Sequence, residues 1–198
     1  MAHLDLIDPD YNYNPLNIDC NYYDKLTLKP YIETESGLSI ISANIRSANR
    51  NFDDFIGLLN SFKVKFHTII LCESWLSSES DWVPVPGYTA FHSVRSVGRG
   101  GGVSILVDEI FASSLVHEIS HNNEFIESCG VKVVCANKEC FVTAVYRPPN
   151  SGLNSFNNYM LHILEYLQPN RNEVVIAGEF NVDVGSKNLS YDEKKYIE

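Results

Sequence analysis

The sequence predicts an α/β fold built from short buried strands and two amphipathic helices. Apolar runs at residues 38–44, 68–72 and 174–177 are typical of buried strands, because each is short and ends at a polar residue. Segments 52–62 and 156–167 instead repeat apolar residues every three or four positions, which is typical of a helix that buries one face. Strands and helices that alternate in this way favour a layered α/β domain.

The composition is that of one globular domain, alone or with a tail. The chain has 198 residues, of which 44% are hydrophobic and 20% charged, and this excludes wholesale disorder, collagen and repeat arrays. No apolar stretch approaches the roughly 20 residues of a membrane span, and the first ten residues lack the regions of a secretory signal. We therefore expect a soluble intracellular protein without a membrane partner.

Charge and cysteine content narrow the function classes. A net charge of −10 taken alone speaks against nonspecific nucleic-acid binding, which depends on Lys and Arg. The charge is uneven, however, since residues 38–178 hold thirteen acids and ten bases and are nearly neutral. The five cysteines form an odd set without a CxxC pair, so we expect buried reduced thiols rather than a zinc ribbon or a disulfide scaffold.

The first half of the chain divides into an arm and the start of the domain. Residues 1–37 are rich in Asp, Asn, Tyr and Pro and lack a periodic apolar face, so we predict an irregular polar arm, poorly ordered and dispensable to the core. The domain is predicted to span residues 38–198. After its first strand, a helix is expected from Asn51, with Asn51 as its cap and Asp53 and Asp54 near its positive end.

The remaining elements follow in order along the chain. Strands are predicted at 68–72, 88–92 and 102–107, the last one after a turn made by Gly100, Gly101 and Gly102. Residues 131–135 and 140–145 have the spacing of a hairpin around Ala-Asn-Lys-Glu. The second helix is expected to be capped by Asn154 or Ser155 and to stop before Pro169, and strand 174–177 follows it.

Four predicted strands end at polar side chains, namely Asn44, Glu73, Tyr146, and Glu179 with Asn181. In layered α/β proteins such strand ends meet on one rim, where loops place functional groups on a rigid base. Carboxylate and amide oxygens suit a hard cation such as Mg²⁺ better than Zn²⁺. Hydrolysis of a phosphate ester fits such a site, because the cation would neutralise charge that develops on the phosphoryl oxygens.

These segments resemble a known family in their order and spacing. The chain is similar to the endonuclease/exonuclease/phosphatase superfamily over about residues 38–183, and most similar to the endonuclease domains of non-LTR (LINE-type) retrotransposons. The motifs are Asn44 after the first strand, Leu-Cys-Glu73-Ser-Trp, Arg99-Gly-Gly-Gly-Val, Val-Tyr146-Arg-Pro-Pro, and Val-Val-Ile-Ala-Gly-Glu179-Phe-Asn181. The resemblance implies a DNase-like four-layer sandwich, in which two β-sheets lie face to face and helices flank them.

The resemblance also implies a role for each strand-end residue. Glu73 would be the metal-binding carboxylate, Asn44 would lie beside the metal, Tyr146 near the scissile phosphate and Asn181 on the phosphate. Glu179 occupies the position of the Asp that orients the attacking water. The implied cofactor is Mg²⁺, with Mn²⁺ as a substitute and no small-molecule cofactor, and the implied partner is DNA in the nucleus.

Two departures from the family pattern bear on activity. Glu179 is one methylene longer than the family's Asp, and catalytic geometry tolerates little displacement. The family's late Ser-Asp-His segment would lie beyond residue 198, so we expect a chain truncated at its C-terminus, with its last strands missing and little activity.

Several assignments stay open at this stage. Arg95 and Arg147 are candidates for contacts to the nucleic-acid backbone, and Asp183 is either a second metal ligand or, preferably, a loop acid. The histidines are expected to be structural or solvated. The leading hypothesis is a Mg²⁺-dependent DNA endonuclease that nicks target DNA for reverse transcription. The alternatives are an inactive, degenerate fragment of that domain and a superfamily phosphatase or lipid phosphodiesterase. The oligomeric state is not predicted.

Overall fold

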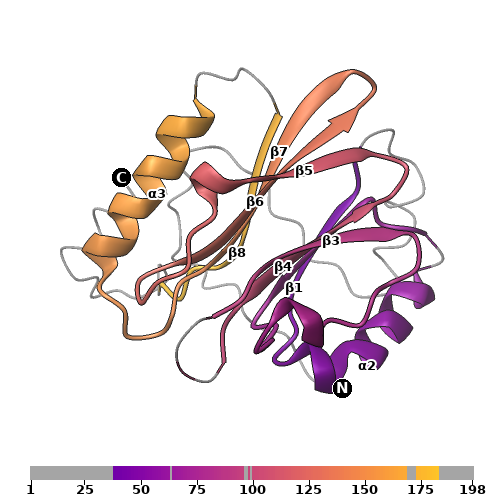
Figure 1. Ribbon diagram of the computed structural model, residues 1–198, viewed down its shortest axis with the longest axis horizontal. Coiled ribbons are helices and arrows are strands. Elements are labelled where there is room, and N and C mark those ends of the chain that lie inside the picture. Colours follow the sequence, from indigo (N-terminus) through magenta and orange to yellow (C-terminus); the bar gives the residue numbers. More distant parts are fainter. Residues whose placement is uncertain (1–37, 63, 96–97, 99, 169–172, 183–198) are drawn as a thin grey trace, which may run out of the picture. The chain divides into compact units, whose positions relative to one another are not determined.

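Two four-stranded β-sheets lie face to face, and one helix covers the outer face of each (Figure 1). The computed structural model describes residues 38–62, 64–95, 98, 100–168 and 173–182. The predicted polar arm at residues 1–37 lies outside the described residues. Within the described part, the order of helix, sheet, sheet and helix confirms the predicted four-layer α/β sandwich, while the expected loss of terminal strands stays a prediction.

The first sheet has the strand order β1-β2-β4-β3, and the second has the order β5-β6-β7-β8. Each sheet contains one parallel pair, β1 with β2 and β7 with β8, and its other pairs are antiparallel. The strands of the first sheet are Ile40–Asn44, Thr68–Cys72, Tyr88–Ser93 and Val103–Asp108, for β1 to β4. Those of the second are Ala112–Val116, Glu127–Cys135, Lys138–Tyr146 and Glu173–Glu179, for β5 to β8.

The main core lies between the two sheets. Every second residue of the central strands points into it, because side chains alternate between the two faces of a strand. The buried members come from β2, β4, β6 and β7: Ile70, Cys72, Val103, Ile105, Val107, Cys129, Val131, Val133, Cys140, Val142, Ala144 and Tyr146. The opposite faces of the sheets form two outer cores under the helices.

The helices α2 (Ala48–Ser61) and α3 (Leu153–Leu167) close these outer cores. Phe55 and Leu59 of α2 are buried, as the predicted apolar stripe requires. On α3, Phe156 and Ile163 are fully buried in a cluster with Val145 of β7. Among the described residues, no helix is long and apolar enough to cross a membrane.

The predicted helix caps are wrong. Helix α2 begins three residues earlier than expected, after Ser47, so Asn51 lies within its first turns and donates from its side chain to the carbonyls of Ile45 and Arg46 (both 2.9 Å). Helix α3 begins after Gly152, which places Asn154 and Ser155 inside the helix. The start of α2 is set by hydrogen bonds to the segment after β2. The N–H of Ala48, the first residue of the helix, donates to the carbonyl of Ser74 (2.8 Å).

Most strands lie where they were predicted, and β5 was missed. Strand β2 has the predicted bounds, and the hairpin turns at Ala136 and Asn137, whose φ values are 48° and 64°. Such a pair of positive φ angles is typical of a two-residue hairpin turn. Strand β5 is an edge strand with the sequence Ala-Ser-Ser-Leu-Val, which is too polar to stand out as an apolar run.

The described cysteines are reduced, as predicted. Cys72, Cys129 and Cys140 are buried and Cys135 is half-buried, and all four are free thiols. Burial raises the pKa of Cys72 and of Cys129 to about 12. Thiols that stay protonated at neutral pH are poor nucleophiles, so these side chains serve packing.

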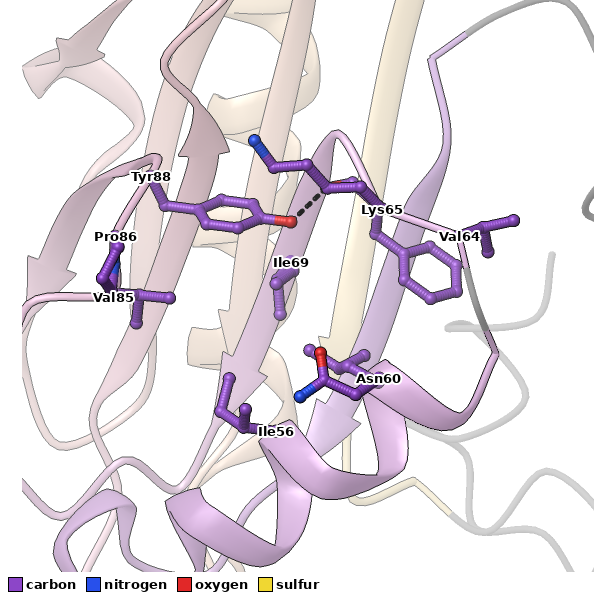
Figure 2. Close-up of a pocket in the computed structure, with 10 residues that line it drawn as sticks. Ile56, Asn60, Val64, Lys65, Ile69, Val85, Pro86 and Tyr88 are labelled. Carbon is purple, nitrogen blue, oxygen red and sulfur yellow. Dashed lines mark hydrogen bonds between the residues drawn. The ribbon is translucent and has the colours of Figure 1, made fainter.

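A cavity of about 490 Å³ lies between α2 and the outer face of the first sheet (Figure 2). Two of its polar groups are paired: the Tyr88 hydroxyl donates to the carbonyl of Phe66 (2.6 Å), and Lys65 pairs with Asp108 (2.8 Å). Ile69, near the start of β2, lines this cavity, whereas Glu73 follows the other end of that strand. The cavity is therefore distinct from the rim where the predicted site residues lie.

Among the described glycines, Gly178 of β8 is the one where an added Cβ atom would come nearest to another atom. A Cβ atom there would lie 1.8 Å from the carbonyl oxygen of Val145 on β7, and its φ of 150° is one that other residues rarely adopt. We expect Gly178→Ala to lower the free energy of unfolding by roughly 3 kcal/mol or more, since the two strands must separate.

Urea denaturation measures this loss, and Gly57→Ala is the matched control. Gly57 lies in the interior of α2 with open space around its Cα, so alanine should raise stability by up to about 1 kcal/mol. Equal stability of Gly178→Ala and the wild type would contradict the close pairing of β7 with β8.

Candidate active site

The two parallel strand pairs bring the predicted residues to one rim. In the first sheet Asn44 is the partner of Cys72, so Glu73 follows directly beside it. In the second sheet Tyr146 is the partner of Glu179. The Asn44 side-chain amide joins the two sheets, because it donates to Glu73 (Nδ2 to Oε1, 3.0 Å) and also to the carboxylate of Glu179. The predicted convergence of strand ends is therefore present.

Unusual backbone conformations place these side chains. Glu73 has a φ of 54° and Asn181 a φ of 49°, and Arg46, two residues after Asn44, has a φ of 46°. Residues other than glycine reach this region at some cost, and such residues gather at functional sites. The turn at Glu73 is held by backbone bonds from Ser74 to Gly102 (3.1 Å) and from Trp75 to Gly101 (2.9 Å).

Burial and nearby negative charge raise the pKa values of two groups at this rim. Burial, and then the negative charge of Glu73, raises the pKa of Glu179. Burial also raises the pKa of Tyr146 to about 12, with Glu73 as the next contribution. Glu179 is thus a stronger base than an ordinary glutamate, and the Tyr146 phenol keeps its proton at neutral pH and can donate a hydrogen bond.

Arg95 and Arg147, the candidates for contacts to the nucleic-acid backbone, both have partners within the protein. Arg147 is buried, and its guanidinium donates to the carbonyls of Asn181 (2.6 Å) and Ser151 (2.5 Å). The Nε of Arg95 is paired with the buried carboxylate of Glu127. Arg147 therefore holds two loops together and Arg95 is the counter-charge of Glu127, while a contact of either arginine with nucleic acid stays a prediction.

Asn181 is engaged within its own loop. Its Nδ2 donates to the carbonyl of Arg147 (2.7 Å), which completes a reciprocal pair with the Arg147 side chain. The side-chain amide expected to bind a phosphate thus donates to a backbone carbonyl in the structure. Its role on the phosphate stays a prediction, and Asp183, the open candidate, lies outside the described residues.

Glu127 is a polar residue of this rim that sequence reasoning missed. It begins β6, has an exposed fraction of only 1%, and is the cross-strand partner of Tyr146. The sequence does hold a signal, because Glu127 is separated from Val131 and Val133 by even numbers of residues and therefore points to the same apolar face. The predicted strand began at residue 131, four residues too late to include it.

The described histidines do not reach the carboxylates. His67 hydrogen-bonds to Ser39 (3.0 Å) and His92 to Ser104 (2.8 Å), as structural histidines do. Within the described part of the chain, no hydrogen bond joins a histidine to Glu73, Glu179 or Tyr146.

The donor chemistry of the rim fits a hard divalent cation. Glu73 and Glu179 offer carboxylate oxygens that share a single amide donor, and a cation between them would relieve their repulsion. The described residues contain no group of three or more His, Cys, Asp or Glu that could hold a metal by itself. Two carboxylates suit Mg²⁺, which commonly keeps several of its waters.

Known proteins resemble this chain in structure but not in sequence. A comparison with protein-family models gives no match, and neither does a comparison with curated protein sequences. Among solved structures, the endonuclease domain of TRAS1, a telomere-specific non-LTR retrotransposon, is 14% identical with a TM-score of 0.63, covering 81% of this chain and 68% of that one.

Two further solved structures with this fold come from other proteins. The catalytic domain of human Nocturnin is 9% identical with a TM-score of 0.57, covering 80% of this chain and 67% of its own. A humanized D. rerio TDP2 is 14% identical with a TM-score of 0.54, covering 81% and 70%. All three belong to the endonuclease/exonuclease/phosphatase (DNase I-like) superfamily, and the likeness confirms that this chain has that fold.

The crowding of Glu73 and Glu179 predicts a stability change that depends on pH. The pKa of Glu179 is higher in the folded than in the unfolded chain, so ionisation costs stability as the pH rises above the usual glutamate value. Without added metal, Glu179→Gln should therefore be more stable than the wild type at pH 7. The difference should disappear below about pH 3.5, where glutamates are protonated in both states.

Thermal unfolding at several pH values in the presence of a chelator checks this prediction. Glu109→Gln is the control, because Glu109 is exposed in the turn after β4. Glutamine keeps an oxygen that can accept from Asn44, so the variant removes charge and little else. A pH-independent effect of Glu179→Gln would show that the carboxylates do not repel each other.

Proposed function

We propose that this chain is a divalent-metal-dependent phosphodiesterase domain that nicks DNA, of the kind found in non-LTR retrotransposons. The observation that supports this most is the Asn44 amide shared by two carboxylates from opposite sheets, on a fold common to nucleases and phosphatases. The likeness to the TRAS1 endonuclease domain favours DNA as the substrate. We also propose that the domain spans residues 38–198, that it acts in the nucleus and that its cofactor is Mg²⁺.

The rim residues have complementary parts in such a reaction. Glu73 and Glu179 would hold the cation, which when bound polarises a phosphoryl oxygen and neutralises its negative charge. The Glu179 carboxylate would also orient the water that attacks phosphorus, whose proton passes to solvent. As the bond from phosphorus to O3′ breaks, the leaving oxygen takes up a proton from solvent water, which leaves a 3′-hydroxyl and a 5′-phosphate.

Tyr146 and Asn44 orient these groups. The Tyr146 phenol, whose pKa is about 12, stays protonated and can donate to a non-bridging phosphate oxygen. The Asn44 amide fixes the separation of the carboxylates through its two hydrogen bonds. Neither residue adds negative charge to a site that must accept a phosphodiester.

A second candidate function is a degenerate domain that binds metal or DNA without catalysis. It is favoured by Glu179 at the position where the family has Asp. Glu179→Asp separates the two readings, because it should raise activity if only the length of the carboxylate limits the reaction.

Nicking of supercoiled plasmid in Mn²⁺ or Mg²⁺ tests the proposal. We expect Glu73→Gln to lower the nicking rate at least about 10²-fold, since it removes a charge that acts directly on the reacting centre. Tyr146→Phe should lower it less, by about 10-fold, because one hydrogen bond is lost. The exposed Glu109→Gln serves as the control and should nick like the wild type.

Equal nicking by Glu73→Gln and the wild type would place the activity elsewhere or in a contaminant. Absence of nicking in every variant, Glu179→Asp included, would favour the degenerate domain. Release of inorganic phosphate from a sugar phosphate, without nicking, would favour a phosphatase.

Metal binding can be measured apart from activity. Calorimetric titration with Mg²⁺ or Mn²⁺ should show weak binding, because two carboxylates are a small charge for a cation that loses its waters reluctantly. Glu73→Ala should abolish the binding heat, whereas Glu109→Ala should not change it. Unchanged affinity in Glu73→Ala would move the metal site away from this rim.

A further inference from the structure

A buried ion pair lies directly behind the rim. The Glu127 side chain is 1% exposed and that of Arg95 is 19% exposed, and the two are in contact through Nε and Oε1. Arg95 follows β3 of the first sheet, whereas Glu127 begins β6 of the second. The pair therefore links the two sheets at the end where Glu73 and Glu179 lie.

Stability alone does not account for this pair. Taking two charges out of water costs several kcal/mol per ion in general, and buried ion pairs are often no more stabilising than apolar side chains of similar size. Burial indeed raises the pKa of Glu127, against the opposing effects of the Gly102 N–H and Arg95. The pair makes directional contacts, and these connect it to Glu73 and Tyr146 of the candidate site.

The first set of contacts leads to Glu73. The second oxygen of Glu127 accepts the backbone N–H of Gly102. The carbonyl of Gly102 in turn accepts from Ser74 (3.1 Å), and that of Gly101 from Trp75 (2.9 Å). Ser74 and Trp75 are the two residues after Glu73, so Glu127 fixes the segment that holds Glu73 at its positive φ.

This close approach requires glycine. A Cβ on Gly102 would lie 2.6 Å from the Ser74 hydroxyl oxygen, and the φ of Gly102 is 79°. A Cβ on Gly101 would lie 2.4 Å from the Arg95 guanidinium. The predicted glycine turn thus packs between Glu73's segment and the ion pair.

The second set of contacts leads to Tyr146. The Arg95 guanidinium carbon lies 5.7 Å from the centre of the Tyr146 ring, within the range of a cation–π contact. Glu127 and Tyr146 are also direct partners across β6 and β7. Rotation of Arg95 away from Glu127 would therefore remove the contact that covers the Tyr146 ring.

We propose that Glu127 is a positioning residue of this site, which fixes Glu73 through the glycine turn and Tyr146 through Arg95. The inference rests on the proposed function for its catalytic consequence. Its structural part stands on the hydrogen bonds and the ring contact alone. Glu127 does not touch the substrate or the metal, and acts only through these neighbours.

Kinetics of the full chain test the catalytic consequence. Glu127→Gln keeps the size of the side chain and removes its charge, so it should lower kcat for plasmid nicking by about 10²-fold, the effect of a displacement of about 1 Å, with KM changed less than about 2-fold. Glu139→Gln is the matched control, because Glu139 pairs with Lys132 (3.0 Å) on the exposed part of the same hairpin. An unchanged kcat in Glu127→Gln would overturn the proposal.

Nuclear magnetic resonance tests the structural part without any activity. In Glu127→Gln we expect faster hydrogen exchange of the Gly102 and Ser74 amides and a shifted ring resonance of Tyr146, assigned with Tyr146→Phe. Arg95→Lys should shift the Tyr146 ring and leave the Ser74 amide protected, which separates the two sets of contacts. Glu139→Gln should change none of these signals.

The two measurements distinguish failure of the inference from failure of the proposed function. If the wild type does not nick DNA, the function fails, and the amide exchange and ring resonances still decide whether Glu127 positions Glu73 and Tyr146. Unchanged exchange at Ser74 together with an unchanged Tyr146 ring in Glu127→Gln would overturn the positioning role, whatever the activity.

Discussion

The parallel pairing of β1 with β2 and of β7 with β8 is the constraint on which the site depends. Parallel neighbours end at the same edge, so Asn44 and Glu73 leave the first sheet together, and Tyr146 and Glu179 leave the second together. The apolar core between the sheets holds these two edges against each other. The Asn44 amide, bonded to carboxylates from both sheets, marks the point where they meet.

Crowded negative charge is the physical consequence of this arrangement. Burial and then the charges of Glu73, Glu179 and Glu127 raise the pKa of Tyr146, and Arg95 acts in the opposite direction. Folding places these carboxylates together because the strands leave no alternative, and the excess charge favours a bound cation. The cation of the proposed reaction would offset this charge, while Glu127 is neutralised within the protein by Arg95.

The backbone of the rim is unfavourable locally and is stabilised by packing elsewhere. Glu73, Asn181 and Arg46 adopt positive φ angles, each of which costs of order 1–3 kcal/mol. Strand β2, which leads to Glu73, is buried along its whole length, and Val145 of β7, the strand that pairs with β8, is fully buried. Rigid strands that end in strained turns hold functional groups at fixed separations, which loops alone would not do.

The sequence by itself determined the strands, the helices and the polar residues at the strand ends. Apolar runs and the helical repeat are local patterns, so strand 68–72, the hairpin and the apolar stripes of both helices were predictable, whereas the polar edge strand β5 was not. The resemblance supplied the sandwich, which the solved structures confirm as a fold.

Only the tertiary structure decided where the helices begin and which partners the charged side chains have. The start of α2 depends on a hydrogen bond to Ser74, 26 residues away, and Arg147 and Asn181 bind each other across 34 residues. Arg95 was a candidate for DNA contact in the sequence, and folding paired it with Glu127 from the other sheet. A local pattern shows which residues are charged, but burial and partners depend on which distant segments become neighbours, and that is fixed only when the two sheets pack.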